Sequence, residues 1–370
     1  MTFDALVVGG GPAGCAAAIT MARSGHRVAL IERSAGDPRH PWAALATSAA
    51  MRQLRVLDVE PAGHRISQLR LTTQSTSLLR SLGDASLTVI RRPDVDHQLL
   101  SIAEGLGVEV LLGHEATRPM IERGFVRGAA VVNDGSERNL SAEYVVIADG
   151  ANSTFGRALG THRRRDLPYL TCASGTWDTP LSRVVECDVI VGLRRGDDEV
   201  MPGHGWVAPD GRGSATITVV IPSTARDASA ANPLAVLDAT VRSVAQRWSL
   251  DPDRPSIEPR TLRLPVGRSV SPIVGPTFVV VGDGAATTDP FSALGLGPAL
   301  ASGTMAGERV ATAIATGASA PLQSYPDDLT RLLRNDHRRA AIALQIAGRE
   351  IGHAATVAAL KLVAGASRGR

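Results

Sequence analysis

The sequence of 370 residues predicts an α/β fold, and three segments carry that prediction. Residues 2–32 run as an apolar strand, a glycine cluster, a small-residue helix and a second apolar strand. A buried strand over 144–148 runs into Asp149-Gly150, and another over 277–281 runs into Gly282-Asp283. A βαβ opening followed by later strands of the same kind is typical of a Rossmann-like domain, here with strand-rich insertions.

Periodicity and turn residues place the remaining elements. Helices are expected over 93–106, 233–248 and 300–314, where apolar residues recur at helical spacing, and a further helix-like stretch begins at Ala43. Asn133-Asp134-Gly135-Ser136 predicts a hairpin turn between two strands. From 167 to 264 the sequence alternates between short strands and Pro- or Gly-containing breaks.

These elements predict a discontinuous organisation. Residues 1–65, 91–160 and 268–320 form the expected nucleotide-binding domain, and residues 66–90 and 161–267 form a strand-rich substrate domain. A helical segment over 321–370 completes the chain, with an alanine-rich stretch at 340–366.

The composition excludes several classes of protein. A net charge of +3 is too small to favour nucleic-acid binding, and the clusters at 162–165 and Arg338-Arg339 are expected to be solvated faces. Three scattered cysteines give neither a disulfide framework nor a zinc site. No uncharged run of about 18 apolar residues predicts a membrane span, and no export signal precedes the first strand. We therefore expect a cytoplasmic protein without a metal.

The glycine cluster after the first strand is a dinucleotide-binding motif. In Gly9-x-Gly11-x-x-Gly14 the first glycine permits a tight turn, the second lets a pyrophosphate approach and the third lets the helix pack on the strand. Glu32 ends the second strand, where a carboxylate can bind ribose hydroxyls, and it argues against a 2′-phosphate. The nucleotide is thus FAD or NAD. Its expected contacts are Gly9, Gly11, Pro12, Ala13, Gly14, Glu32 and Arg33.

Two later motifs select FAD. The segment 145–153, with Asp149-Gly150, resembles the Asp-Gly motif of the flavin monooxygenase superfamily with the p-hydroxybenzoate hydroxylase fold, and 279–286, with Gly282-Asp283, resembles its Gly-Asp motif. The segment 92–96 resembles that family's Arg-x-x-hydrophobic-Asp stretch. The resemblance implies a GR2-type FAD-binding domain, in which Asp283 binds the ribityl chain and Arg92 lies near FAD. Gly156 stands where relatives carry an arginine, which bears on how a pyridine nucleotide would dock.

The segment 288–303 is similar to the stretch that passes the isoalloxazine ring in three groups of relatives. These are the flavin-dependent halogenases, the geranylgeranyl reductases and the flavoproteins that mature peptidyl quinone cofactors. Proline and glycine suit a loop whose backbone approaches the flavin closely. The expected contacts are Pro290, Gly295, Leu296 and Gly297.

Halogenation is disfavoured by one substitution. The halogenase lysine that relays hypohalous acid falls on Ala44, and the chain's single lysine is Lys361. The halogenase tryptophan pair is likewise reduced to one residue, Trp206.

The resemblance implies a monooxygenase in a biosynthetic pathway. FAD, reduced by NADH, NADPH or a separate flavin reductase, would react with O2, and its C4a-hydroperoxide would hydroxylate an aromatic or indole ring or a carrier- or peptide-bound substrate. His40 and Trp206 are the candidate catalytic residues, and His40 could act as a general base. Two alternatives stay open beside the disfavoured halogenase: an ene-reductase of the geranylgeranyl reductase type, and a flavoprotein that binds a partner without turnover.

Overall fold

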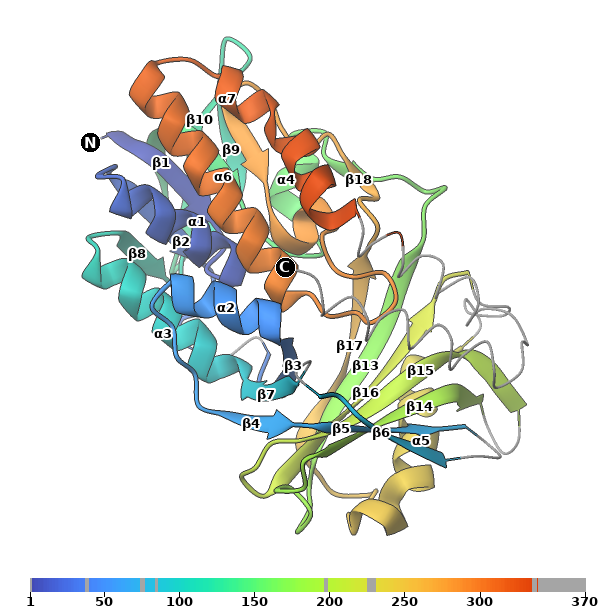
Figure 1. The fold of residues 1–370 in the computed structure, drawn as a ribbon. Helices are drawn as coiled ribbons and strands as arrows, with labels where there is room; N and C mark the ends of the chain where they lie inside the picture. Colours follow the sequence, from blue (N-terminus) through green and yellow to red (C-terminus); the bar gives the residue numbers. More distant parts are fainter. Residues whose placement is uncertain are drawn as a thin grey trace.

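The structure is a computed structural model that describes residues 2–36, 40–73, 77–83, 86–195, 199–224, 231–334 and residue 338. The helix expected over 340–366, Arg339 and Lys361 lie outside the described residues. The expected α/β class is confirmed, with a mixed sheet under helices and a second, antiparallel-rich sheet beside it (Figure 1).

The first sheet has the strand order β8-β2-β1-β11-β10-β9, and β19 pairs with β11. Strands β1, β2, β8, β11 and β19 run parallel, while the β9-β10-β11 meander is antiparallel. The expected turn at Asn133-Asp134-Gly135-Ser136 joins β10 to β11. The bounds are β1 (Thr2–Val8), β2 (Val28–Glu32), β8 (Glu109–Leu112), β9 (Glu115–Glu122), β10 (Phe125–Asn133), β11 (Ser136–Ile147) and β19 (Phe278–Val280).

A layer of helices covers this sheet, and its two central helices pack unusually closely. Helices α1 (Pro12–Arg23), α3 (Arg92–Gly105) and α6 (Leu296–Thr316) lie on one face (Figure 1). A Cβ atom at Gly303 would lie 2.1 Å from the carbonyl oxygen of Ala13, and one at Gly307 would lie 2.8 Å from that of Ala17. Glycine on α6 and alanine on α1 therefore let the two helices touch along their backbones. The shorter elements of this part are α4 (Thr154–Ala158), η1 (Gly282–Ala285) and α7 (Ala320–Gln323).

The second sheet has the order β17-β13-β16-β15-β14-β5-β6, and α5 (Pro233–Trp248), the helix expected at 233–248, packs on one of its faces. Its other face looks toward the first sheet. A two-stranded ribbon, β12 (His162–Arg163) with β18 (Val270–Ser271), lies at the junction. The bounds are β5 (Gln68–Thr72), β6 (Ser77–Ser81), β13 (Tyr169–Asp178), β14 (Glu186–Arg195), β15 (Glu199–Pro209), β16 (Ser214–Pro222) and β17 (Pro255–Pro265).

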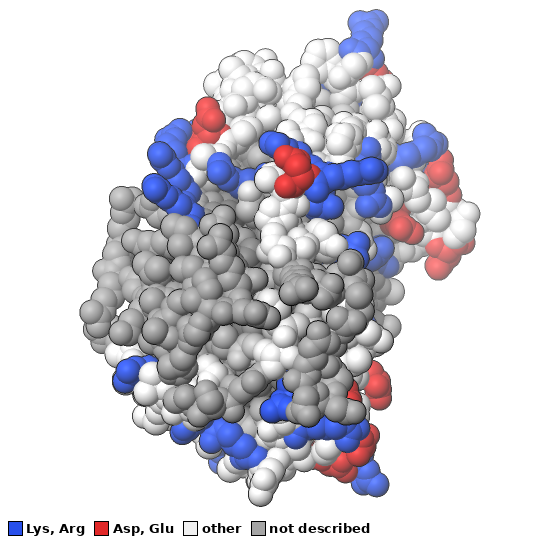
Figure 2. Space-filling view, turned by 90° about the vertical axis from the view of Figure 1, so that its right-hand side faces the viewer, with Lys and Arg blue, Asp and Glu red and all other residues white. Residues whose placement is uncertain are grey.

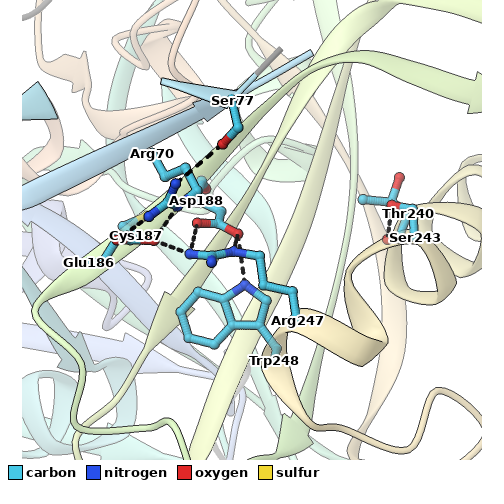
Figure 3. Close-up of polar contacts among 9 residues, drawn as sticks. All are labelled: Arg70, Ser77, Glu186, Cys187, Asp188, Thr240, Ser243, Arg247 and Trp248. Carbon is cyan, nitrogen blue, oxygen red and sulfur yellow. Dashed lines mark hydrogen bonds and ion pairs between the residues drawn. The ribbon is translucent and has the colours of Figure 1, made fainter. Parts of the chain in front are cut away.

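A cluster of charged groups fastens α5 to this sheet, as Figure 3 shows. Asp188 on β14 is 1% exposed, and its carboxylate accepts hydrogen bonds from Arg247 Nε at 2.7 Å and from Trp248 Nε1 at 2.8 Å. Glu186, two residues earlier on the same strand, pairs with Arg70 of β5 at 2.7 Å and also contacts Arg247. The two acids thus tie three elements together on the face away from the first sheet.

The stretch that begins at Ala43 is a strand and not the start of a helix. Residues Ala43–Thr47 form β3, which pairs with β7 (Leu87–Arg91), and β4 (Gly63–Ile66) pairs with the other edge of β7. The helix α2 begins only at Ser48 and ends at Val56. Thr47 ends the strand and caps the helix, because its hydroxyl accepts a hydrogen bond from Ala50 N at 3.2 Å. Tertiary pairing overrides the helix propensity of the three alanines and one leucine.

Exposed arginines lie beside carboxylates in much of the described surface. Arg242 pairs with both Asp238 and Asp253, and Figure 2 shows blue and red side chains next to one another on one face. Among the described helices, none is long and apolar enough to cross a membrane.

Candidate functional site

A cavity of about 820 Å³ lies between the carboxyl ends of β1 and β2 and the inner face of the second sheet. Its wall comes from the turn between β1 and α1, the end of β2, the start of β3, the start of α3, and the segment 281–299. Strands β13, β15, β16 and β17 supply the opposite wall. The ends of parallel strands are where open α/β sheets place their ligands.

The glycines of the first motif have different surroundings. Gly9 has a φ of +110°, as its tight turn requires, and a Cβ atom at Gly14 would lie 1.9 Å from the carbonyl oxygen of Gly9. These two glycines serve backbone packing and do not line the cavity. Gly11 does line it, beside Pro12 and Ala13, and a Cβ atom there would meet no protein atom within 4 Å. The open space in front of Gly11 lies at the N-terminus of α1, where anions are favoured.

Glu32 is held in place at the end of β2. Its carboxylate accepts hydrogen bonds from Gly10 N and from Ser34 N, both at 2.8 Å, and the residue is 6% exposed. It lines the cavity, so its outer surface faces the space beside Gly11. Arg33, by contrast, is exposed and does not line the cavity.

Asp283 and Arg92 lie on the same side of the cavity. Burial raises the pKa of the Asp283 carboxyl, although the Thr288 hydroxyl, which donates to it at 2.6 Å, favours the ionised form. Arg92 Nη2 pairs with Asp96 at 3.1 Å, and Gly282 N donates to the Ser302 hydroxyl at 3.0 Å. A half-buried carboxylate that lines a cavity suits a polyhydroxy ligand, because its oxygens can accept hydrogen bonds from hydroxyl groups.

Asp149 has a structural role in this arrangement. Its carboxylate accepts a hydrogen bond from Phe155 N at 2.8 Å at the start of α4, and burial raises its pKa. Its neighbour Gly150 lines the cavity, whereas Asp149 does not. At Gly156, where relatives were expected to carry an arginine, a Cβ atom would lie 2.3 Å from the Ser153 hydroxyl oxygen. The close turn around Ser153 therefore explains the glycine.

The segment 288–297 forms a shaped loop that leads into α6. Asp289 Oδ1 accepts from Phe291 N at 3.1 Å and from Ser292 N at 2.6 Å, which fixes the turn. Gly295 and Leu296 line the cavity, so the N-terminus of the long helix α6 opens into it. Two expected contacts lie elsewhere: Pro290 is buried outside the lining, and Gly297 packs against Ala50.

The second sheet supplies one wall of the cavity, and Trp206 is the only residue of this wall that the sequence motifs predicted. The residues of this wall alternate along four strands, and the register sets them side by side: Ser174 lies between Thr218 and Arg260. The hydroxyls of Ser174 and Thr218 are 2.8 Å apart. Period-2 patterns such as Cys172-x-Ser174 and Thr216-x-Thr218 were the available signal. The wall consists of Cys172, Ser174, Trp206, Ala208, Thr216, Thr218, Arg260, Leu262 and Leu264.

Histidine and aromatic side chains mark the edges of the site. His40 and Trp42 both line the cavity, with their rings edge-on at 5.6 Å. His204 on β15 was not predicted; its ring stacks on Phe291 at 4.9 Å and lies edge-on to Trp206. Burial lowers the pKa of His204 to about 4, so this imidazole is neutral at physiological pH and braces the loop before α6.

The residues present fit FAD. The N-termini of α1 and α6 open into one cavity, Gly11 leaves room for a phosphate, and Glu32 and Asp283 offer carboxylates at two places along it. A dinucleotide has its negative charge at the pyrophosphate and its hydroxyls on the ribose and ribityl chains, which matches this distribution.

Comparisons with known proteins agree with this fit. Residues 2–337 match the family described as "FAD binding domain". The chain is 30% identical over 319 residues to a menaquinone reductase of Mycolicibacterium smegmatis, covering 82% of this chain and 75% of that protein. It is also 30% identical over 328 residues to a digeranylgeranylglycerophospholipid reductase of Methanoculleus marisnigri, covering 85% and 78%.

Solved structures share the fold. A geranylgeranyl bacteriochlorophyll reductase-like protein from Thermoplasma acidophilum superimposes with a TM-score of 0.82 at 22% identity, covering 98% of this chain and 91% of that one. PqsL of P. aeruginosa in complex with 2-aminobenzoylacetate gives a TM-score of 0.73 at 17% identity, covering 98% and 100%.

Proposed function

Because the chain belongs to the FAD-binding-domain family and is an FAD-dependent oxidoreductase, we propose that it reduces a carbon–carbon double bond in a prenyl-type substrate. The observation that carries the proposal is the wall opposite the expected FAD end of the cavity. Leu262 and Leu264 lie on that wall with Trp206, and Leu45 of β3 and Leu294 of the loop before α6 extend the apolar lining next to Trp206. Such a surface suits a branched aliphatic chain.

The printed names of two relatives support the same reading. Both are reductases, and menaquinone and digeranylgeranylglycerophospholipid both carry prenyl chains. This proposal replaces oxygenation, which the sequence motifs favoured, as the first candidate activity. Both activities require FAD and differ in what accepts the electrons.

FAD, when bound, supplies the hydride for such a reduction. The residues of this chain would hold and orient it: the α1 N-terminus at Gly11 binds the pyrophosphate, Glu32 the ribose and Asp283 the ribityl hydroxyls. The N-terminus of α6 would stabilise negative charge on the ring system. NADH, NADPH or a separate reductase is the proposed source of electrons.

Saturation of a double bond also requires a proton. His40 lines the cavity, and its imidazole is the proposed donor of this proton to the substrate carbon. Cys172 lines the same wall, but burial raises the pKa of its thiol to about 12, so it forms part of the neutral surface. The Leu and Trp side chains exclude water around the reacting carbon atoms.

Oxygenation remains the second candidate because of the paired hydroxyls on the wall. Ser174 and Thr218 can bind polar substituents of an aromatic ring, and the fold is shared with PqsL. O2 would then be the co-substrate. Halogenation is not proposed, because Ala44 lines the cavity where a lysine would be needed.

The products distinguish the two candidates. Enzyme with FAD, reduced by dithionite without oxygen, is mixed with a geranylgeranyl lipid that carries no quinone, and the product is analysed by mass spectrometry. The proposal predicts a product with two added hydrogens, formed without air. A product with an added oxygen atom, formed only in air, would establish oxygenation instead.

A further inference from the structure

One arginine on the substrate wall has no partner of opposite charge. Arg260 on β17 lines the cavity, and within the described part of the chain it takes part in no hydrogen bond or ion pair. The register places it directly beside Ser174 on β13, whose hydroxyl is bonded to that of Thr218. A guanidinium and two hydroxyls therefore stand in a row across three strands.

The acids that line the cavity are all engaged elsewhere. Glu32 holds Gly10 and Ser34, Asp283 accepts from Thr288, and Asp96 pairs with Arg92. Asp94 pairs with Arg212 at 3.4 Å. The positive charge of Arg260 is thus not neutralised by any of these carboxylates, and it faces the cavity together with hydroxyl donors.

The surroundings of Arg260 suit one end of an amphiphilic molecule. On the same face of β17, Leu262 and Leu264 follow Arg260 at alternate positions, and they run toward the buried part of the wall. Arg260 itself is exposed. The strand therefore offers charge at its open end and aliphatic surface at its buried end, as an anionic head and an apolar tail require.

We propose that Arg260, with Ser174 and Thr218, binds a phosphate or carboxylate group of the substrate and makes the enzyme selective for anionic prenyl compounds. This inference rests on the proposed function, since it concerns the head of the same prenyl-type substrate. It assigns Arg260 a role in specificity: it positions the tail in the cavity and takes no part in the transfer of hydride or proton.

The test compares substrates that differ only in charge. Binding of geranylgeranyl diphosphate and of geranylgeraniol to the oxidised FAD enzyme is followed by the change in flavin absorbance. Dodecyl phosphate and dodecanol form a second pair without prenyl groups. We expect the native enzyme to prefer the anion of each pair by about tenfold, the size of one charge-assisted contact.

The variants are Arg260→Gln and a matched control, Arg263→Gln. Arg263 lies three residues along the same strand, does not line the cavity, and stands over the Tyr169 ring at 4.8 Å. Both variants remove one positive charge. Arg260→Gln should bring the ratio of affinities close to 1, whereas Arg263→Gln should keep it. Equal loss in both variants would show a general charge effect and overturn the assignment.

The two pairs of probes separate this inference from the proposed function. If the enzyme binds only the dodecyl compounds, and prefers the phosphate through Arg260, the anion site is confirmed and the prenyl substrate is refuted. If geranylgeraniol is bound and reduced as well as its diphosphate by the native enzyme, the reductase stands and the anion site is refuted.

Discussion

The two ends of the cavity are built in different ways. At the end beneath α1 the polar groups come from short contiguous motifs, and Glu32 there is held by hydrogen bonds from Gly10 N and Ser34 N. The wall on the second sheet is assembled from alternate residues of four strands, and Arg260 there has no partner in the described chain. The residues expected to bind the cofactor thus come from local motifs. The residues expected to bind the substrate are far apart in the chain and become neighbours only through the strand register.

The largest expected effects separate two glycines of the first motif. Gly11→Ala adds a methyl group in open space, so the free energy of unfolding without FAD should stay the same while FAD affinity falls about 10- to 100-fold. Gly14→Ala adds it against the carbonyl oxygen of Gly9 and should destabilise the protein itself by about 3 kcal/mol. Thermal unfolding and FAD titration of both variants check this. Equal destabilisation by both would contradict the division of roles.

A substitution remote from the cavity should affect stability alone. Asp188→Ala leaves Arg247 and the Trp248 indole N–H without their acceptor and should cost about 3 kcal/mol of unfolding free energy. FAD affinity should not change. Asp253→Ala removes an exposed partner of Arg242 and serves as the control, with an effect below about 1 kcal/mol. Urea denaturation measures both free energies. An Asp188→Ala protein as stable as the native one would show that the Asp188 contacts do not hold α5 to the sheet.

His204 should make the stability of the wall depend on pH. Its pKa is about 4 in the folded protein, against an ordinary value of 6.5. Between these values the unfolded chain takes up a proton that the folded protein does not, so the free energy of unfolding falls as the pH drops from about 6.5 to about 4, by about 3 kcal/mol at most. In His204→Gln this part of the pH dependence should disappear. Identical profiles for both proteins would show that His204 does not titrate in this way.

The smallest expected effect lies on the substrate wall. Thr218→Val keeps the shape of the side chain and removes the hydroxyl bonded to Ser174. We expect FAD affinity to stay the same and the affinity for geranylgeranyl diphosphate to fall about fivefold, since one neutral hydrogen bond contributes about 1 kcal/mol. Parallel titrations with each ligand test this. If the variant lost more affinity for FAD than for the diphosphate, Thr218 would belong to the FAD end of the cavity and this prediction would be wrong.

The sequence predicted the strands, turn and helix at the end beneath α1, because the information for them is local. The strand, glycines, helix and Glu32 lie within about thirty residues, and the two later strands carry recognisable Gly-Asp and Asp-Gly turns. Even there, the motifs did not distinguish residues that line the cavity from residues that only hold the backbone around it. Asp149 caps α4, and Gly14 packs against Gly9. That distinction depends on which side of a turn faces the open space.

The wall on the second sheet was hardly accessible to sequence reasoning. Ser174, Thr218 and Arg260 are far apart in the chain and become neighbours only through pairing of β13 with β16 and β17. The strand β3 was mistaken for a helix for the same reason, because its partner β7 lies more than forty residues away. Long-range register decides both cases, and no local propensity encodes it.

The central claim is that electrons leave the reduced enzyme for a double bond of a prenyl substrate held on the second sheet. The most direct test is an anaerobic titration of the reduced FAD enzyme with geranylgeranyl diphosphate, followed by flavin absorbance. The account predicts that the yellow colour returns in proportion to the substrate added, without oxygen. If the flavin stays bleached until air is admitted, the substrate is not the electron acceptor and the account is wrong.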